Sequence, residues 1–226
     1  MTILSATENF IIEDTRHFMV QILGQETTSH DIGHVFRVEK MALHLQKYEG
    51  GEIFTLRLAS LLHDIGTPKE NKLGGDHAVY GSEMAFDFLK EEQRKYPDVL
   101  SDFQIEKVCS MILSHRFSSG SKPEMIEAQI LQDADRLDAL GAVGVFRSIY
   151  SMGSLRMLKN LAGVDKGNSK KTVYEKDPID GFYAYMCYKP QEIPNRLNTN
   201  TAKEIARERL KFMENFEKKL RNETTI

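Results

Sequence analysis

His63 and Asp64 are adjacent at the end of an apolar run, in the segment LASLLHDIGTPK. A histidine beside an aspartate supplies a nitrogen and an oxygen ligand at one point, which suits a divalent metal ion. A buried histidine that hydrogen-bonds to a carboxylate would explain the pair equally well. The metal interpretation therefore depends on further ligands that reach the same place.

Three histidines interrupt otherwise apolar helix faces: His34, His63 and His115. Positions three and four residues apart lie on one face of a helix, so these side chains are expected to point inward. Burying a polar ring without a partner costs about 1–3 kcal/mol, and one shared metal ion would remove that cost at all three sites. His17 and His44 fall among charged residues, and we expect both to be solvated.

The segment DADRLDAL supplies three further carboxylates, Asp133, Asp135 and Asp138. Asp135 shares a helix face with the apolar Leu131. The other two could be solvated or could pair with Arg136. Helical periodicity does not separate the three.

A second short motif, HDIGH, spans His30 to His34 and resembles the i, i+4 histidine pair of zinc proteases. Aspartate stands where those enzymes have a longer glutamate base, and Gly33 weakens a helix between the two histidines. His30 and Asp31 lie where a helix would begin. N-terminal capping explains both, so we discard the protease interpretation.

Helices must position these residues, because apolar residues recur at helical spacing and no segment alternates as a strand would. Thr7 is the expected N-cap of the first helix and Gly24 its stop. The predicted helices span residues 7–23, 30–48, 52–65, 77–95, 102–116, 124–150 and 201–221. Residues 67–76 are predicted to form a loop, and residues 163–181 a second loop that is either a lid over the site or merely mobile.

The composition bounds the fold. Apolar residues make up 41% and charged residues 28% of the 226 residues, which is ordinary for a globular protein. We predict an all-α, single-domain helical bundle with an embedded metal site over residues 1–226. Its motif core is expected at about residues 30–150, with the C-terminal helices of residues 151–226 packed on it.

Charge, cysteine content and hydropathy limit which partners and which cellular compartment we expect. The net charge of −3 gives no basic surface for nucleic acid. Cys109 and Cys187 are far apart and in no paired motif, so the sequence indicates neither a disulfide framework nor a thiolate zinc site. The acidic N-terminus and the lack of a long apolar run predict no signal peptide and no membrane span, hence a cytoplasmic protein.

With His34, His63-Asp64 and Asp135 in that order, the chain resembles the HD-domain superfamily of metal-dependent phosphohydrolases, whose signature is H…HD…D on successive helices. The segments similar to small bacterial members are HDIGHVFRV, LASLLHDIG, HAVYGSEMA, ILSH, LQDADRLDALGAVGVFR and IARERLKFM. The resemblance implies that these four residues hold one divalent ion with open positions for water and phosphate. Mn²⁺ is favoured, and Ni²⁺, Co²⁺, Fe²⁺, Zn²⁺ or Mg²⁺ would also suit.

His77 and His115 occupy places where dinuclear members of the superfamily have further ligands. Arg116 follows His115, so the doubled histidines of some dinuclear members are missing here. We therefore expect a single ion, with His77 and His115 near its ligands or in contact with the substrate phosphate.

Phosphate chemistry also needs proton acceptors and cations. Asp64 and Asp135 are the predicted proton acceptors. The predicted cationic substrate contacts are Arg37, Lys69, Lys72 and Arg136. The two lysines could instead be solvated, and the second arginine could simply pair with a neighbouring aspartate.

The resemblance implies a phosphohydrolase that acts on a small-molecule nucleotide, and favours a nucleoside or deoxynucleoside triphosphate pyrophosphohydrolase. The alternatives are a nucleotide phosphomonoesterase and a phosphodiesterase. In a further interpretation the metal is structural, and the protein binds a nucleotide or a partner protein without turnover. The sequence leaves base preference, sugar preference and homodimer formation open.

Overall fold

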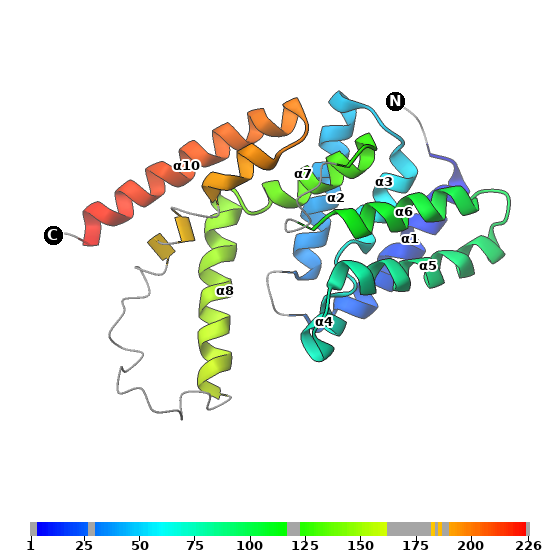
Figure 1. The fold of residues 1–226 in the computed structure, drawn as a ribbon, viewed down its shortest axis with the longest axis horizontal. Helices are drawn as coiled ribbons and strands as arrows, with labels where there is room; N and C mark the ends of the chain where they lie inside the picture. Colours follow the sequence, from blue (N-terminus) through cyan, green and yellow to red (C-terminus); the bar gives the residue numbers. More distant parts are fainter. Residues whose placement is uncertain are drawn as a thin grey trace. The chain divides into compact units, whose positions relative to one another are not determined.

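The computed structural model describes residues 4–26, 30–116, 123–161, 182–183, 185–186 and 190–224, with the side chains of 152–161 left out. Every secondary-structure element in these residues is helical, which confirms the predicted all-α fold (Figure 1). None of the described helices is both long enough and apolar enough to cross a membrane. The predicted loop 163–181 lies outside the described residues.

The chain divides into two compact units, which are Met1–Arg136 with Leu197–Ala202, and Leu137–Arg196 with Lys203–Ile226. The helices of the first unit are α1 (Ala6–Leu23), α2 (Ile32–Glu49), α3 (Ile53–Leu62), α4 (Thr67–Leu73), α5 (His77–Lys95), α6 (Asp102–Ser114) and α7 (Ile126–Leu137). Helix α3 packs against α1, α2 and α6 and is buried along most of its length, so it forms the centre of the core. Helix α5 packs along α6, and the short α4 packs against α5.

The observed helix starts follow from capping. Helix α1 begins after Ser5 and not after the predicted Thr7, because Ser5 and Glu8 form a reciprocal capping box. Asp31 caps α2 by accepting a hydrogen bond from the backbone N–H of His34 at 2.7 Å. Helix α5 has the bounds that the sequence predicted.

Two further predictions of local structure were wrong. Residues 67–73 of the predicted loop form α4, with Pro68 in its first turn, where a missing N–H costs nothing. The predicted long helix 124–150 is instead two helices, α7 and α8 (Gly141–Leu161). The break comes where Gly141 adopts a φ of 74°, a left-handed conformation that favours glycine.

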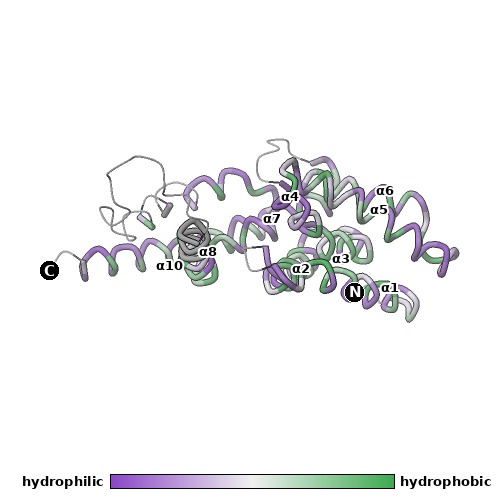
Figure 2. The backbone as a smooth tube through the Cα atoms, turned by 90° about the horizontal axis from the view of Figure 1, so that it is seen from below, coloured by the Kyte–Doolittle hydropathy of each residue, from purple (hydrophilic) through white to green (hydrophobic). Residues whose placement is uncertain are grey.

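The second unit contains α8, the 3-10 helix η3 (Ile193–Arg196) and most of α10 (Asn200–Thr224). Its described contacts include a 2.7 Å ion pair between Asp138 and Arg147 and an edge-to-face contact between Phe182 and Phe216. Helix α10 is hydrophilic with apolar residues at intervals along the tube in Figure 2, and Met213 is one of its buried side chains.

Candidate metal centre

Helix ends of the first unit bring five histidines and two aspartates together. The residues are His30, His34, His63, Asp64, His77, His115 and Asp135. Two lie at the start of α2, two follow α3, one begins α5, one ends α6 and one lies in the last turn of α7. Because each comes from or near a helix end, side chains from five helices can meet at one point without breaking the core.

Asp64 lies at the centre of the cluster. Its Oδ2 atom is 2.7 Å from Nδ1 of His30 and 3.3 Å from Nε2 of both His34 and His63. Its Oδ1 atom is 3.7 Å from Nε2 of His77 and 3.6 Å from Nε2 of His115. The two oxygens of one carboxylate therefore face two different groups of histidines.

The outward-facing nitrogens fix which tautomer the rings adopt. Nδ1 of His63 donates to the carbonyl of Ser60 at 2.8 Å, and Nδ1 of His115 donates to the carbonyl of Ile112 at 2.6 Å. In the neutral ring the Nε2 lone pair then points at Asp64. A lone pair opposite a carboxylate oxygen is repulsive unless a proton or a cation lies between them, so the donor set fits a metal ion.

The carboxylates of the cluster are held in their charged form. Burial works to raise the pKa of Asp64, but the charges of His63 and His30 and hydrogen bonds from the neighbouring histidines hold it well below its usual range. Burial likewise opposes ionisation of Asp135, yet the hydrogen bond and charge of His34 lower the pKa of that carboxyl. Both groups therefore carry the negative charge that a divalent cation requires.

The cluster has a buried side and an exposed side. His63 and Asp64 are essentially inaccessible to solvent, and His34 and His115 are almost so. The side chains of His30 and Asp135 are 39% and 22% exposed. Water or a substrate would therefore approach from the side of these last two residues.

The four predicted metal ligands lie together. Nε2 of His34 is 3.2 Å from Oδ1 of Asp135 and 3.5 Å from Nε2 of His63, and Asp64 is within 3.3 Å of both rings. The sets of residues whose ligand atoms lie within 4.8 Å of one another are His34 with His63 and Asp135, His30 with His34 and Asp64, and Asp64 with His77 and His115. Each set could hold an ion, and a single ion remains a prediction.

The neighbouring aspartates are separated by what they contact. Asp133 is buried and accepts hydrogen bonds from the backbone N–H groups of Asn198 and Thr199, and burial raises its pKa despite those bonds. Asp138 pairs with Arg147. Of the three carboxylates in the DADRLDAL segment, the described contacts bring Asp135 into the cluster.

His30 and Glu70 have contacts in the site that the sequence pattern did not reveal. Asp31 caps α2 as predicted, but the His30 ring contacts Asp64 instead of the helix end. The i, i+4 spacing in HDIGH was the available signal. Glu70 was hidden in the predicted loop 67–76, and its carboxylate accepts a hydrogen bond from Nδ1 of His77 at 2.8 Å.

The predicted cationic contacts lie in varied surroundings. Nζ of Lys69 is 4.3 Å from the centre of the Tyr80 ring and 3.8 Å from Glu83. Lys72 is exposed at the end of α4, and Arg37 is partly buried on α2. Arg136 is buried, and its charge works to lower the pKa of Asp133. Substrate contact by these cations remains a prediction. His17 and His44 are exposed, as predicted.

The sequence and the fold are similar to those of known proteins of the HD domain family. The model of the HD domain family matches residues 31–140. The uncharacterized protein YpgQ of Bacillus subtilis (strain 168) is 30% identical over 211 residues, which cover 92% of this chain and 91% of YpgQ. A crystal structure of Bacillus subtilis YpgQ in complex with ADP superposes with a TM-score of 0.65 at 23% identity, over 94% of this chain and 97% of that one. An HD-superfamily hydrolase from Bacillus thuringiensis gives a TM-score of 0.64 at 27% identity, over 96% and 98% of the two chains.

Proposed function

This chain belongs to the HD domain family, and on that premise we propose that it is a divalent-metal-dependent phosphohydrolase that acts on nucleotides. The reaction that we favour is hydrolysis of a nucleoside or deoxynucleoside triphosphate to the monophosphate and pyrophosphate. The observation that carries the proposal is the cluster of five histidines around the buried Asp64. The complex of the related YpgQ with ADP supports a nucleotide as substrate.

The chemistry of the donor set supports hydrolysis. A divalent cation bound by His34, His63, Asp64 and Asp135 would polarise a phosphoryl oxygen and lower the pKa of a bound water. In this proposal Asp135, whose side chain is 22% exposed, accepts a proton from the attacking water. His30 shares that side and lies within hydrogen-bond distance of Asp64, so its ring can hold a proton beside that carboxylate.

The proposal is tested by product analysis. We expect the purified protein with Mn²⁺ to release pyrophosphate and a nucleoside monophosphate from at least one triphosphate in a panel of bases and sugars. Free phosphate from a monophosphate would identify a phosphomonoesterase instead, and cleavage of a cyclic nucleotide or dinucleotide a phosphodiesterase.

Asp64→Ala supplies the inactive control. The substitution removes the carboxylate that contacts five histidine rings, so activity should fall by about 10³-fold or more, as it does when one member of a catalytic set is removed. His44→Ala, an exposed histidine on α2, should retain full activity. No phosphate or pyrophosphate from any nucleotide with Mn²⁺, Co²⁺, Ni²⁺, Fe²⁺, Zn²⁺ or Mg²⁺ would falsify the proposal and favour a binding protein.

A further inference from the structure

His77 differs from His63 and His115 in what holds its ring. Those two histidines follow helices and donate from Nδ1 to a backbone carbonyl of the preceding turn. His77 is the first residue of α5, so no helical turn precedes it. Its Nδ1 instead donates to the carboxylate of Glu70 on α4 at 2.8 Å. The orientation of this ring therefore depends on a side chain.

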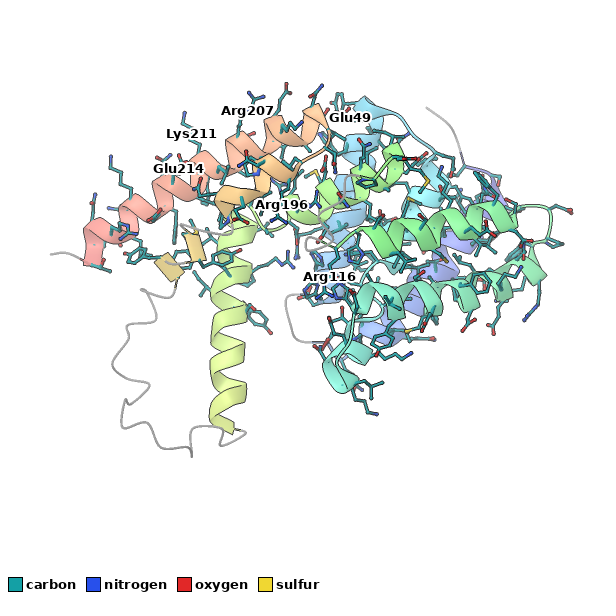
Figure 3. The ribbon with its side chains drawn as sticks, viewed as in Figure 1. Glu49, Arg116, Arg196, Arg207, Lys211 and Glu214 are labelled. Atoms are coloured by element: carbon teal, nitrogen blue, oxygen red, sulfur yellow. The ribbon has the colours of Figure 1, made fainter. Side chains whose placement is uncertain are left out.

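Glu70 is itself held in place. Its second oxygen, Oε1, is 3.5 Å from Nη2 of Arg116, and Nη1 of Arg116 is 2.8 Å from Asp76, the N-cap of α5. Figure 3 labels Arg116 just beyond the end of α6. Arg116 directly follows His115, whose ring also faces Asp64. The sequence of contacts from Asp76 through Arg116 and Glu70 to His77 thus connects α4, α5 and the end of α6 beside the cluster.

An ordinary surface ion pair does not account for this arrangement. Exposed pairs contribute little to stability, and the side chains of Arg116 and Asp76 are 34% and 43% exposed. The His77 side chain is only 10% exposed, so its ring has few alternative partners. A neutral imidazole carries one proton, and the hydrogen bond at Nδ1 decides whether Nε2 presents a lone pair to an ion or a proton to Asp64.

We propose that Glu70, held by Arg116, is the positioning residue that fixes the tautomer and orientation of His77 towards the metal-binding cluster. The inference deepens the proposed function and rests on it for the role of the cluster in hydrolysis. Asp64, His77 and His115 form one of the sets that could hold an ion, and a carboxylate that accepts the outer proton of a ligand histidine affects metal affinity or activity by about 10–100-fold. Replacing Glu70 should therefore change metal binding even when no nucleotide is present.

The test uses Glu70→Ala, Glu70→Gln and the matched control Glu83→Ala, which removes an exposed carboxylate of the neighbouring α5. Long-range ¹H–¹⁵N NMR spectra of the metal-free and Zn²⁺-loaded proteins report the His77 tautomer, with His77→Asn used for assignment. Calorimetric titration with Mn²⁺ reports affinity. We expect the wild-type and Glu83→Ala proteins to keep the proton on Nδ1 of His77 and to bind Mn²⁺ alike.

Glu70→Ala should lose the preference for that tautomer and bind Mn²⁺ about 10–100-fold more weakly. Glu70→Gln keeps an oxygen acceptor and should restore the tautomer. An unchanged His77 tautomer with Mn²⁺ affinity within about twofold of wild type in Glu70→Ala would overturn the proposal. Circular dichroism shows whether Glu70→Ala folds. If it does not, Arg116→Gln, which removes the ion pair that holds Glu70, is tested instead by the same measurements of the His77 tautomer and Mn²⁺ affinity. Neither measurement uses a nucleotide. If the protein hydrolyses no nucleotide, that result refutes the proposed function and leaves the role of Glu70 to be decided by these two measurements.

Discussion

At the level of single residues, the chemistry of this protein depends on which ring nitrogen faces Asp64. His34, His63, His77 and His115 present Nε2, whereas His30 presents Nδ1. The apolar faces of the helices predicted the inward direction of three histidines correctly. His30 precedes its helix, where helical periodicity gives no direction, so its contact with Asp64 could not be predicted in that way.

His30 should contribute to metal binding less than His63 does. The His30 side chain is 39% exposed and bonds only one oxygen of Asp64 at 2.7 Å, so water can replace it in His30→Ala. We expect that variant to weaken Mn²⁺ binding by about tenfold, at the low end of the effect of residues around a metal, and His63→Ala to remove measurable binding. Titration calorimetry measures both, with His17→Ala as the exposed control. Equal losses in the two variants would show that His30 is a full ligand.

Glu127 is expected to make stability depend on pH away from the cluster. Burial works to raise its pKa, but the backbone N–H of Glu52 and the ammonium of Lys107, both within 2.9 Å, lower it overall. A carboxyl whose pKa is lower in the folded chain stabilises the fold above its ordinary value of 4.5, and this stabilisation is lost as the pH falls through the folded-state pKa. The contribution of the Glu127 carboxylate to the free energy of unfolding is therefore fully present at pH 7.

Glu127→Gln should lower the free energy of unfolding at pH 7 by about 1.5–3 kcal/mol, the range for a hydrogen bond to a charged group. The difference from wild type should shrink below pH 4.5, because the wild-type carboxyl then becomes neutral as well. Urea unfolding at several pH values measures both quantities. Glu106→Gln, an exposed neighbour of Lys107, is the control, and a difference that grows towards low pH would contradict the assignment.

At the level of helices, capping and periodicity predicted the elements that carry the ligands. The failures have local causes. Pro68 and Gly74 suggested a loop, yet they begin and end the single short helix that brings Glu70 to His77. Leu137 and Leu140 continue the apolar pattern of α7 across a break that the left-handed Gly141 enforces. Hydrophobic pattern alone did not reveal either boundary.

Gly66 permits close packing of the turn that follows His63 and Asp64 against α5. A Cβ atom at Gly66 would lie 2.1 Å from the carbonyl oxygen of His77 and 2.5 Å from the amide nitrogen of Gly81. Backbone atoms cannot move that far without displacing α5, so Gly66→Ala should cost about 3 kcal/mol or more and weaken metal binding. At Gly81 the nearest atoms to an added Cβ are 3.4 Å away, so Gly81→Ala should be nearly neutral. Thermal unfolding of the two variants tests the contrast, which fails if both behave alike.

At the level of the whole molecule, the metal should stabilise the fold. Ligands from five helices of the first unit meet at the cluster, and an unfolded chain has no such site. A ligand at about 1,000 times its dissociation constant adds about 4 kcal/mol to the free energy of unfolding. We expect EDTA to lower the melting temperature and Mn²⁺ to restore it, while Asp64→Ala responds to neither. Equal responses of that variant and the wild type would show that the stabilising ion binds elsewhere.

The sequence predicted less about organisation at this level. The helical class followed from periodicity along the whole chain, and the family from motifs between about residues 30 and 215, of which the family model matches residues 31–140. The division into two compact units, and the return of Leu197–Ala202 to the first of them, have no counterpart in periodicity or composition. Leu197–Ala202 follows Arg136 by about 60 residues. Whether segments so far apart in the sequence meet depends on the path of the whole chain, and local sequence patterns do not encode that path. The single domain of residues 1–226 stays a prediction.

The hydrogen bonds to Asp133 have a consequence for synthesis on the ribosome. This carboxylate lies two residues before Asp135 on α7, and its backbone partner at Asn198 is translated 65 residues later. At about 5–20 residues per second, that interval lasts about 3–13 s. During this interval the nascent chain contains every histidine of the cluster. It does not yet contain Asn198, whose backbone N–H donates to the buried Asp133. The order of translation therefore leaves the Asp133 carboxylate without these backbone partners until Asn198 and Thr199 have been made.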